Sequence, residues 1–343
     1  MRRAAKIAAA LVGMVVLFFA GLALFNLAAA AIGRSRHPPL GNLYAVENRK
    51  MHLYCVGTGS PTIVLEAGAG DDVLYWQTIQ PGLAKITRVC AYDRVGIGWS
   101  EPQTGTRDSE AIARQLHELL NQAQVARPLV LVGASAGGFH VREYAREFPE
   151  EVSGMVLLDA SSPNQVNELP GSRAWFDGEK EKRPRELKWE KLRTWSGWQR
   201  LMGRCHEEGV PTALEPFHAA MDAEDCRPGW VGGDLGEFLN FEVSGREAER
   251  LSSLGERPLL VMSQDPDRSK QGWTADAIAA QPIWYREQEA LKSLSKRSWR
   301  VIARGAPHHV HQSRPELVVS EIGRLVAFLR GGAAPAWGTT VTE

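Results

Sequence analysis

The 343-residue chain is long enough for one large domain or two small ones, and 44% of its residues are hydrophobic and 23% charged. These ordinary proportions exclude a collagen-like or disordered chain. Forty basic residues balance forty acidic ones. Because no basic excess is available to neutralise phosphates, we expect no nucleic-acid partner. The charges are unevenly distributed, because residues 1–46 hold five of the basic residues and none of the acidic ones. The rest of the chain therefore has a formal net charge of −5.

The first 33 residues predict a membrane anchor. Ile7–Ile32 contains no charged residue, and a helix of that length is about 39 Å long, against about 30 Å for the hydrocarbon core of a bilayer. Basic residues before this run favour an N-terminus inside and a body outside the cytoplasm. A cleaved signal peptide, which would give a secreted or periplasmic protein, is the alternative, because Ala28–Ala31 would suit a signal peptidase. Residues 34–42 have the composition of a linker.

Beyond the linker, short apolar runs alternate with helical segments. Continuous apolar strands that alternate with helices predict an α/β fold with a mainly parallel, doubly wound sheet. We assign this core to residues 43–162 and 258–330, and the tail 331–343 is expected to be loose. The predicted strands are Met51–Val56, Thr62–Leu65, Arg88–Tyr92, Leu129–Val132, Met155–Leu158, Leu259–Met262 and Trp299–Ala303. The predicted helices are Asp108–Gln124, Gly138–Phe148 and Pro315–Leu329.

Residues 163–257 interrupt this alternation. The segment is rich in charge, has no strong strand pattern and is expected to form a helical cap. It holds five of the eleven tryptophans, namely Trp175, Trp189, Trp195, Trp198 and Trp230. We expect these rings to form the core of the cap, with an apolar substrate pocket as the alternative place for some of them.

A candidate nucleophile stands directly after the strand Leu129–Val132. Gly133–Gly137 reads Gly-Ala-Ser-Ala-Gly, which matches the G-x-S-x-G pattern of a nucleophile elbow. The flanking glycines leave room for a sharp strand-to-helix turn, and Ser135 would then stand at a helix N-terminus, where developing negative charge is favoured. A structural Gly-Ser-Gly turn is the alternative.

Serine becomes a good nucleophile only when a base removes its proton. Histidines cluster only at His308, His309 and His311, directly after the last predicted strand. No cysteine or carboxylate accompanies them, so we do not expect a metal site. A carboxylate at a strand end should orient the base, and there are three candidates in the sequence: Asp159, Asp265 and Asp267.

These motifs resemble the α/β-hydrolase superfamily, in its branch of capped serine hydrolases that includes esterases and proline iminopeptidases. The resemblance covers residues 43–330. It implies the chain order Ser135, Asp267, His308, and counting from Pro258 in the family's P-x-L-x-x-x-G-x-x-D stretch leads to Asp267. Asp265 remains an alternative, because Gln264 replaces the glycine of that stretch.

The resemblance also assigns His308 as the base, through the terminal G-H-x-x-x-x-x-x-P segment, although Pro307 stands where glycine is usual. Asp93–Ser100 resembles a segment that is structural in the family. The oxyanion loop would be Leu65–Gly70, which lacks the usual His-Gly, with the main-chain N–H groups of Ala69 and Ala136 as donors.

Four cysteines allow three pairings, and the sequence does not choose among them without a fold. In the strand order of the superfamily the second and fourth strands are neighbours. The resemblance therefore implies a Cys55–Cys90 disulfide, and within the cap we expect a Cys205–Cys226 disulfide.

The resulting prediction is a membrane-anchored serine hydrolase that cleaves a carboxylic ester of an apolar small molecule and needs no metal or cofactor. Serine at the elbow argues against haloalkane dehalogenase and epoxide hydrolase chemistry, which uses aspartate there. One alternative is an aminopeptidase or amidase of the proline iminopeptidase type, in which Glu207 or Glu208 would bind a free amine. Another is a catalytically inactive, membrane-anchored binding protein. The sequence makes no prediction of oligomeric state.

Overall fold

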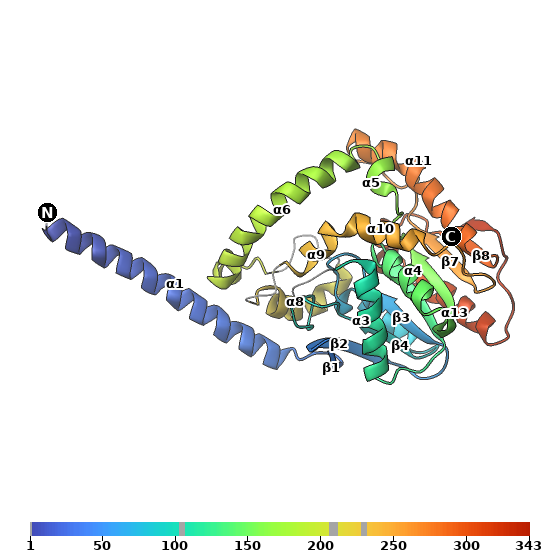
Figure 1. Cartoon of the computed structure of the whole chain (residues 1–343), viewed down its shortest axis with the longest axis horizontal. Helices are drawn as coiled ribbons and strands as arrows, with labels where there is room; N and C mark the ends of the chain where they lie inside the picture. Colours follow the sequence, from blue (N-terminus) through green and yellow to red (C-terminus); the bar gives the residue numbers. More distant parts are fainter. Residues whose placement is uncertain (1, 103–106, 206–211, 228–231) are drawn as a thin grey trace.

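In this computed structural model, residues 2–102, 107–205, 212–227 and 232–343 are described. They form a nine-stranded sheet with the order β1-β2-β4-β3-β5-β6-β7-β8-β9 (Figure 1). Only β2 runs antiparallel to its neighbours β1 and β4, and all other described pairs are parallel. The strands are β1 Asn42–Val46, β2 Arg49–Val56, β3 Thr62–Glu66, β4 Val89–Tyr92, β5 Leu129–Ala134, β6 Val152–Leu158, β7 Leu259–Ser263, β8 Ser298–Ile302 and β9 Thr340–Thr342.

Helices cover both faces of the sheet, and each face has its own apolar cluster. Ile63 and Leu65 of β3 belong to one cluster and Val64 to the other, as expected because side chains alternate along a strand. The helices and 3₁₀ turns around the sheet are η1 Val73–Thr78, α2 Gln80–Leu83, α3 Ser109–Gln122, α4 Gly137–Glu147, η2 Pro149–Glu151, α11 Ala275–Ala290, η4 Leu291–Leu294, α12 Val310–Ser313 and α13 Pro315–Leu329. The predicted α/β class is confirmed.

Both ends of the sheet differ from the sequence prediction. The predicted linker is shorter, because helix α1 (Arg2–Arg36) runs on to Arg36 and β1 begins at Asn42. The tail is not loose. Its strand β9 pairs in parallel with β8, and the Trp337 ring packs against Trp299 and Phe328. The three-residue strand β9 was too short to leave a pattern in the sequence.

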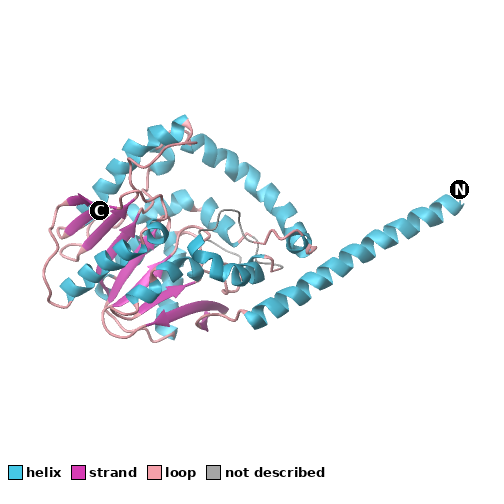
Figure 2. Ribbon diagram, turned by 180° about the vertical axis from the view of Figure 1, so that it is seen from behind, coloured by secondary structure: helices cyan, strands magenta, loops and turns pink. Residues whose placement is uncertain are grey.

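The described part of the cap, between β6 and β7, is helical. Its elements are α5 Gln165–Glu168, α6 Ser172–Trp195, α7 Trp198–Leu201, η3 Thr212–Phe217, α8 His218–Asp225, α9 Gly233–Leu239 and α10 Phe241–Glu249. Helix α6 arches away from the sheet, and its C-terminal end lies near α1 (Figure 2).

The expectation that the cap tryptophans form its core is wrong. Trp175, Trp189, Trp195 and Trp198 are between 43% and 68% exposed, and Trp230 lies outside the described residues. The described apolar cluster of the cap is small and consists mainly of phenylalanine, with Val166, Phe176 and Phe238 buried and Phe241 packed against them. Trp189, Trp195 and Trp198 therefore face outward, whereas Trp175 lines a cavity beneath the cap, in agreement with the alternative given for some of these rings.

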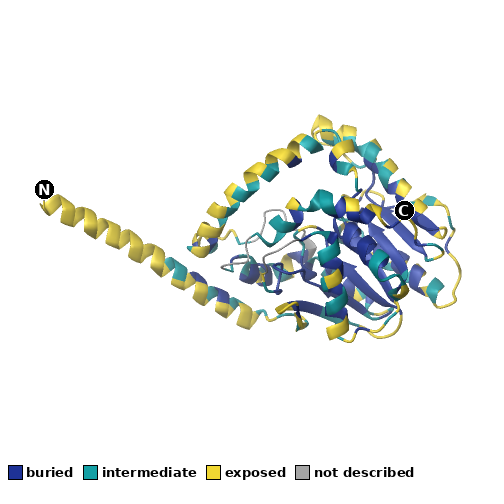
Figure 3. Ribbon diagram, viewed as in Figure 1, coloured by how far each residue is buried: buried dark blue, intermediate teal, exposed yellow. Residues whose placement is uncertain are grey.

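Helix α1 is long and apolar enough to cross a membrane. Its residues 2–21 are exposed and project from the body (Figure 3). From Leu22 onward the helix packs against the cap, mostly against α8, and Asn26 and Ala30 are buried there. The C-terminal part of α1, from Leu22, is therefore part of the folded body.

Both predicted disulfides are present. Cys55 of β2 lies directly opposite Cys90 of β4 in the antiparallel register, and the two are bonded. Cys205 and Cys226 are bonded within the cap. Disulfides persist in oxidising compartments, so their presence is in keeping with a body outside the cytoplasm.

Candidate active site

Ser135 occupies a strained turn between β5 and α4. Its φ of 49° places a non-glycine residue in the left-handed region, which typically costs about 1–3 kcal/mol and is most often found at functional sites. The Ser135 N–H donates to the Leu158 carbonyl of the neighbouring strand β6 (3.1 Å), and its carbonyl accepts from the Ser161 N–H (2.9 Å). Two main-chain bonds thus hold the serine at the carboxyl edge of the sheet.

The second glycine of the elbow is required by close packing. A Cβ on Gly137 would lie 2.4 Å from the Glu66 carbonyl oxygen and 2.6 Å from that of Ala67. The start of α4 therefore packs so closely against the end of β3 that no side chain fits at position 137. This contact brings the loop after β3 beside Ser135, where an oxyanion would form.

A continuous chain of hydrogen bonds leads away from Ser135. His308 Nε2 is 3.0 Å from Ser135 Oγ, and His308 Nδ1 is 2.6 Å from Asp159 Oδ2. Because a carboxylate only accepts, Nδ1–H donates to Asp159 and Nε2 is left to accept from the serine hydroxyl. The second oxygen of Asp159 accepts from the Gln264 N–H (3.0 Å) and Trp284 Nε1–H (2.9 Å). Asp159 is fully buried and cannot rotate away from the imidazole without losing these bonds.

The predicted acid, Asp267, is not part of this chain. Its side chain is exposed, and its N–H donates to Asp265 Oδ1 (2.8 Å). The alternative, Asp265, also lies away from His308, because its Oδ2 accepts from the Gly305 N–H (2.8 Å). Asp265 therefore ties the loop after β7 to the loop that carries His308. The structure gives the contact to Asp159, the third candidate from the sequence.

Strand order explains this correction. Asp159 follows β6, which is the direct neighbour of β5 and Ser135, whereas Asp265 and Asp267 follow β7, one strand farther away. Neighbouring strands are about 4.8 Å apart, so the end of β6 is nearer to an imidazole that bonds Ser135. The sequence did contain a signal for Asp159, because this aspartate directly follows the apolar run Met155–Leu158. The family pattern counted from Pro258 pointed to Asp267 instead.

Hydrogen bonds from Arg94 hold the main chain of the candidate oxyanion loop. Its guanidinium donates to the carbonyls of Ala67 (2.9 Å) and Gly68 (2.5 Å) and pairs with Glu66 (2.8 Å). The same group pairs with Glu237 of cap helix α9 through Nε and Nη2, both at 2.8 Å. One buried side chain therefore holds the loop and fastens the cap to the core, in a segment that the sequence resemblance assigns a structural role.

The buried carboxylates of this network differ in their proton affinity. Burial raises the pKa of Glu66 to about 7, an effect that Arg94 reduces but does not cancel. Burial also acts to raise the pKa of Glu237, but the charges of Arg94 and Arg107 outweigh it and lower the value to about 2. Glu237 is therefore a carboxylate at neutral pH and the firm anionic partner of both arginines.

The pKa of His308 is raised above its ordinary value. Burial alone would lower it, but the hydrogen bond to Asp159 and the charge of that carboxylate outweigh the burial. An imidazole with this bias accepts a proton readily and is stabilised once charged. Both properties suit a general base.

A cavity of about 810 Å³ extends from Ser135 beneath the cap. Ala69, Ser135 and Ala136 line the same cavity, so the two predicted oxyanion donors lie on residues that share it with the serine. Its described wall combines aromatic rings with carboxyl groups, and Arg183 pairs with Asp234 within it (3.2 Å). Burial and the nearby carboxylates of Asp93 and Asp225 raise the pKa of Asp72. The acidic lining residues are Asp71, Asp72, Glu179, Glu186, Glu190, Asp225 and Asp234.

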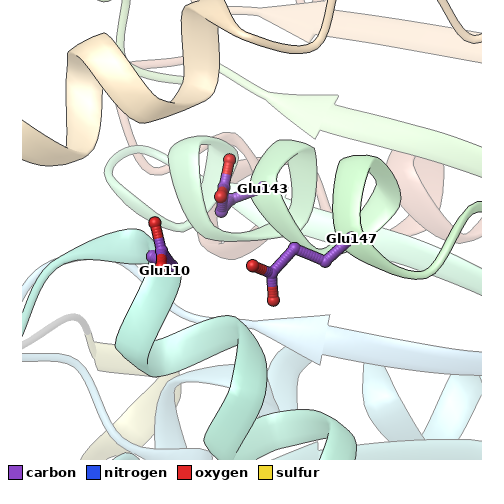
Figure 4. Close-up of side chains that lie close together, drawn as sticks. All are labelled: Glu110, Glu143 and Glu147. Atoms are coloured by element: carbon purple, nitrogen blue, oxygen red, sulfur yellow. The ribbon is translucent and has the colours of Figure 1, made fainter.

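His311 and a group of three glutamates lie outside the hydrogen-bond chain of Ser135, and packing or ion pairs explain their positions. His311 is buried against the Trp76 ring, and burial lowers its pKa to about 3. The carboxylates of Glu110, Glu143 and Glu147 lie within 4.8 Å of one another (Figure 4). Each of the three forms an ion pair with at least one arginine of the group Arg114, Arg146 and Arg250, at 2.5–3.2 Å. This cluster is an ion-pair network that joins α3 to α4.

The comparisons agree with this geometry. A family model described as alpha/beta hydrolase fold matches residues 61–197. The chain therefore has the α/β-hydrolase fold. An uncharacterized protein of Bacillus subtilis, YqjL, is 26% identical to this chain over 279 residues, which are 80% of this chain and 87% of the relative.

Two solved structures illustrate the shared fold. An esterase from Thermogutta terrifontis matches with a TM-score of 0.58 and 22% identity, over 84% of this chain and 98% of its own. A membrane phospholipase A, described as a bacterial virulence factor, matches with a TM-score of 0.55 and 21% identity. The latter match covers 97% of this chain and 100% of the other, so it extends into helix α1 of this hydrolase.

Proposed function

We propose that the protein is a serine esterase in which Ser135, His308 and Asp159 act as a catalytic triad. The observation that carries the proposal is the chain of hydrogen bonds from Ser135 Oγ through His308 to the buried Asp159. Ser135 attacks the ester carbonyl while His308 takes its proton, and the N–H groups of Ala69 and Ala136 bind the oxyanion. His308 then protonates the leaving alcohol, and an acyl group remains on Ser135.

A water molecule completes the reaction. His308 removes a proton from the water, which attacks the acyl carbonyl, and then returns a proton to Ser135 Oγ as the acid product leaves. Asp159 stabilises the charged imidazole in both halves of the cycle without becoming protonated. Each donor to the oxyanion typically contributes about 2.7–4 kcal/mol, so the hold of Arg94 on the loop at Gly68 supports the rate.

We further propose that uncleaved α1 anchors the enzyme, with the body outside the cytoplasm. A signal peptidase would have to cut near Ala28–Ala31, but Ala30 is buried against the body. Asn26 Nδ2 donates to the Thr194 carbonyl (2.6 Å), and Asn26 Oδ1 accepts from Arg200 Nε (2.8 Å). These contacts make the end of α1 part of the folded body, which supports retention of the helix. The two disulfides support the oxidising side of the membrane.

For the substrate we propose a neutral or cationic ester with an apolar acyl group. Aromatic rings of the cap line the cavity, and its carboxylates disfavour anions. The structural likeness to a membrane phospholipase A makes esters of membrane lipids the first compounds to assay. One observation favours aminopeptidase activity as a second candidate, because the same carboxylates offer partners for a free amine. The residues proposed for that role from the sequence, Glu207 and Glu208, lie outside the described residues.

A fluorophosphonate probe tests the proposal, since it labels only an activated serine. We expect labelling of the full-length protein in detergent and none of the Ser135→Ala variant. A folded wild type that takes up no label would favour the alternative of an inactive binding protein. Assays on 4-nitrophenyl esters of graded chain length, beside alanyl and prolyl amides, then separate esterase from aminopeptidase.

A further inference from the structure

Six large apolar side chains gather where α6 ends and α7 begins. We call them the α6–α7 corner: Trp189, Leu192, Trp195, Trp198, Leu201 and Met202. Each is between 43% and 68% exposed. Monomeric soluble proteins seldom leave so many large apolar groups together in water, and such patches usually mark a binding surface. Tryptophan in particular is enriched where a membrane protein passes through the lipid–water interface.

The corner lies directly beside the anchor. Asn26 of α1 bonds the Thr194 carbonyl and Arg200 on either side of the turn that joins the two helices. At that turn Gly197 has a φ of 77°, and a Cβ on it would lie 2.6 Å from the Leu22 carbonyl oxygen. The corner therefore adjoins α1 between Leu22 and Asn26. In Figure 1 the C-terminal end of α6 lies near α1.

The length of α1 determines how deep the contact between α1 and the cap would lie in a bilayer. Lys6 is the last charged residue before the apolar run and belongs at the headgroups. A helix needs about 20 residues to cross about 30 Å of hydrocarbon. Counted from Ile7, that span ends at Asn26, yet the helix already contacts the cap at Leu22. If α1 spans the membrane, this edge of the cap must lie at the outer boundary of the hydrocarbon.

The charges around the corner fit the same location. Residues 188–204 contain five basic residues and one acidic residue. Lys188, Lys191, Arg193 and Arg204 are exposed, whereas the single acid, Glu190, lines the cavity. Apolar aromatic groups with a basic surround are typical of helices that lie in the interface of membranes containing anionic lipids.

We propose that the α6–α7 corner is a second membrane-contacting surface, which inserts among lipid headgroups beside α1. The proposal rests on the proposed anchoring by α1, but not on catalysis. It has a consequence for the substrate: α6 and Gln199 of α7 also line the cavity, so the membrane would lie against the same helices that enclose the reaction space. A lipid ester would then reach Ser135 without crossing water.

Quenching by brominated lipids tests this directly, because residues 1–36 contain none of the eleven tryptophans. Full-length protein carrying Ser135→Ala, which avoids hydrolysis of the lipid, is placed in phosphatidylcholine–phosphatidylglycerol vesicles with or without acyl-chain bromine. We expect the triple variant W189Q/W195Q/W198Q to show at least a twofold smaller quenched fraction. The control, W273Q, removes a partly exposed ring outside the cap and outside the cavity lining, and it should leave the quenching unchanged.

Each other result is informative. Vesicle-bound protein whose corner tryptophans are quenched by aqueous iodide but not by bromolipid overturns the proposal. Shielding from both quenchers places a protein surface there, such as a second copy, and also overturns it. Protein that does not float with vesicles, while wild type still takes up the fluorophosphonate, overturns the anchor and the corner but leaves the hydrolase intact. Should the triple variant not fold, as judged by circular dichroism, the single variant W195Q carries the same comparison.

Discussion

The sheet and the cap differ in whether their large apolar side chains are buried or exposed. Strands β3, β5 and β7 are buried along their whole length, and the proposed triad stands on loops at their carboxyl edge. The cap and α1 instead expose large apolar side chains and bury charged ones, including Glu237. Apolar composition therefore does not by itself indicate a core. If the α6–α7 corner contacts lipid as proposed, its exposed side chains lie in a second solvent.

The largest expected effect tests which aspartate orients His308 at the edge of the sheet. Asp159→Asn should leave the fold intact but lower kcat by about 10⁴-fold, because an amide would favour the wrong tautomer of His308. The matched variant, Asp267→Asn, changes an exposed carboxylate outside the triad and should stay within about twofold of wild type. Steady-state hydrolysis of a 4-nitrophenyl ester measures both. Equal losses in the two variants would refute the assignment of Asp159.

The next effect tests the joint between core and cap. Glu237→Gln removes the charge that Arg94 and Arg107 share in a buried site, so we expect the free energy of unfolding to fall by about 3–5 kcal/mol. The control, Glu242→Gln, weakens ion pairs with Arg173 and Lys180 near the surface of the same cap and should lower the free energy of unfolding by about 1 kcal/mol or less. Denaturant titration of the two variants in detergent makes the comparison.

A smaller effect concerns the pH dependence of the rate. His308 must be neutral to act as base, and its pKa is raised above the ordinary 6.5. We expect kcat/KM to rise with pH and to reach half its maximum above pH 6.5. In Asp159→Asn the raising charge is gone and burial remains, so the residual activity should reach half-maximum at a lower pH. A midpoint that stays in place would show that Asp159 does not bond His308 in solution.

The smallest effect probes the carboxylates of the cavity. The 4-nitrophenyl ester of butyric acid should be hydrolysed several-fold faster than the corresponding monoester of succinic acid, which carries a negative charge. Salt should reduce the difference by screening. Asp234→Asn removes one of the two carboxylates that pair with Arg183 and one negative charge of the cavity, so it should narrow the preference for the neutral ester further. If the anionic ester is preferred, the proposed neutral or cationic substrate class is wrong.

The parts of the fold that could be predicted from the sequence are those set by burial of apolar residues and by local backbone geometry. Seven strands and the elbow at Ser135 were visible because apolar runs and a glycine-flanked serine have one physical explanation each. Ser135 and His308 are hydrogen-bonded, as the resemblance implied. The contact between His308 and Asp159 depends on which strand lies beside β5, and that is a property of the sheet that the sequence does not contain.

The cap shows the second limit. Its tryptophans were interpreted as a core, because composition alone does not tell which side of a helix faces solvent or which solvent it faces. The contacts of Asn26 were also invisible, since a lone polar residue in an apolar run has no sequence partner. Its partners, Thr194 and Arg200, come from a segment more than 160 residues away.

The buried end of α1 has a practical consequence for anyone who prepares a soluble form. A truncation that begins at the apparent linker would strip Asn26 and Ala30 from the cap and uncover the surface of α8 beneath them. Cutting before Leu22 instead would retain the folded part of the helix and discard only the exposed residues 2–21. The boundary between the projecting part of α1 and its packed part lies inside a single helix, at Leu22, where the helix first contacts Gly197.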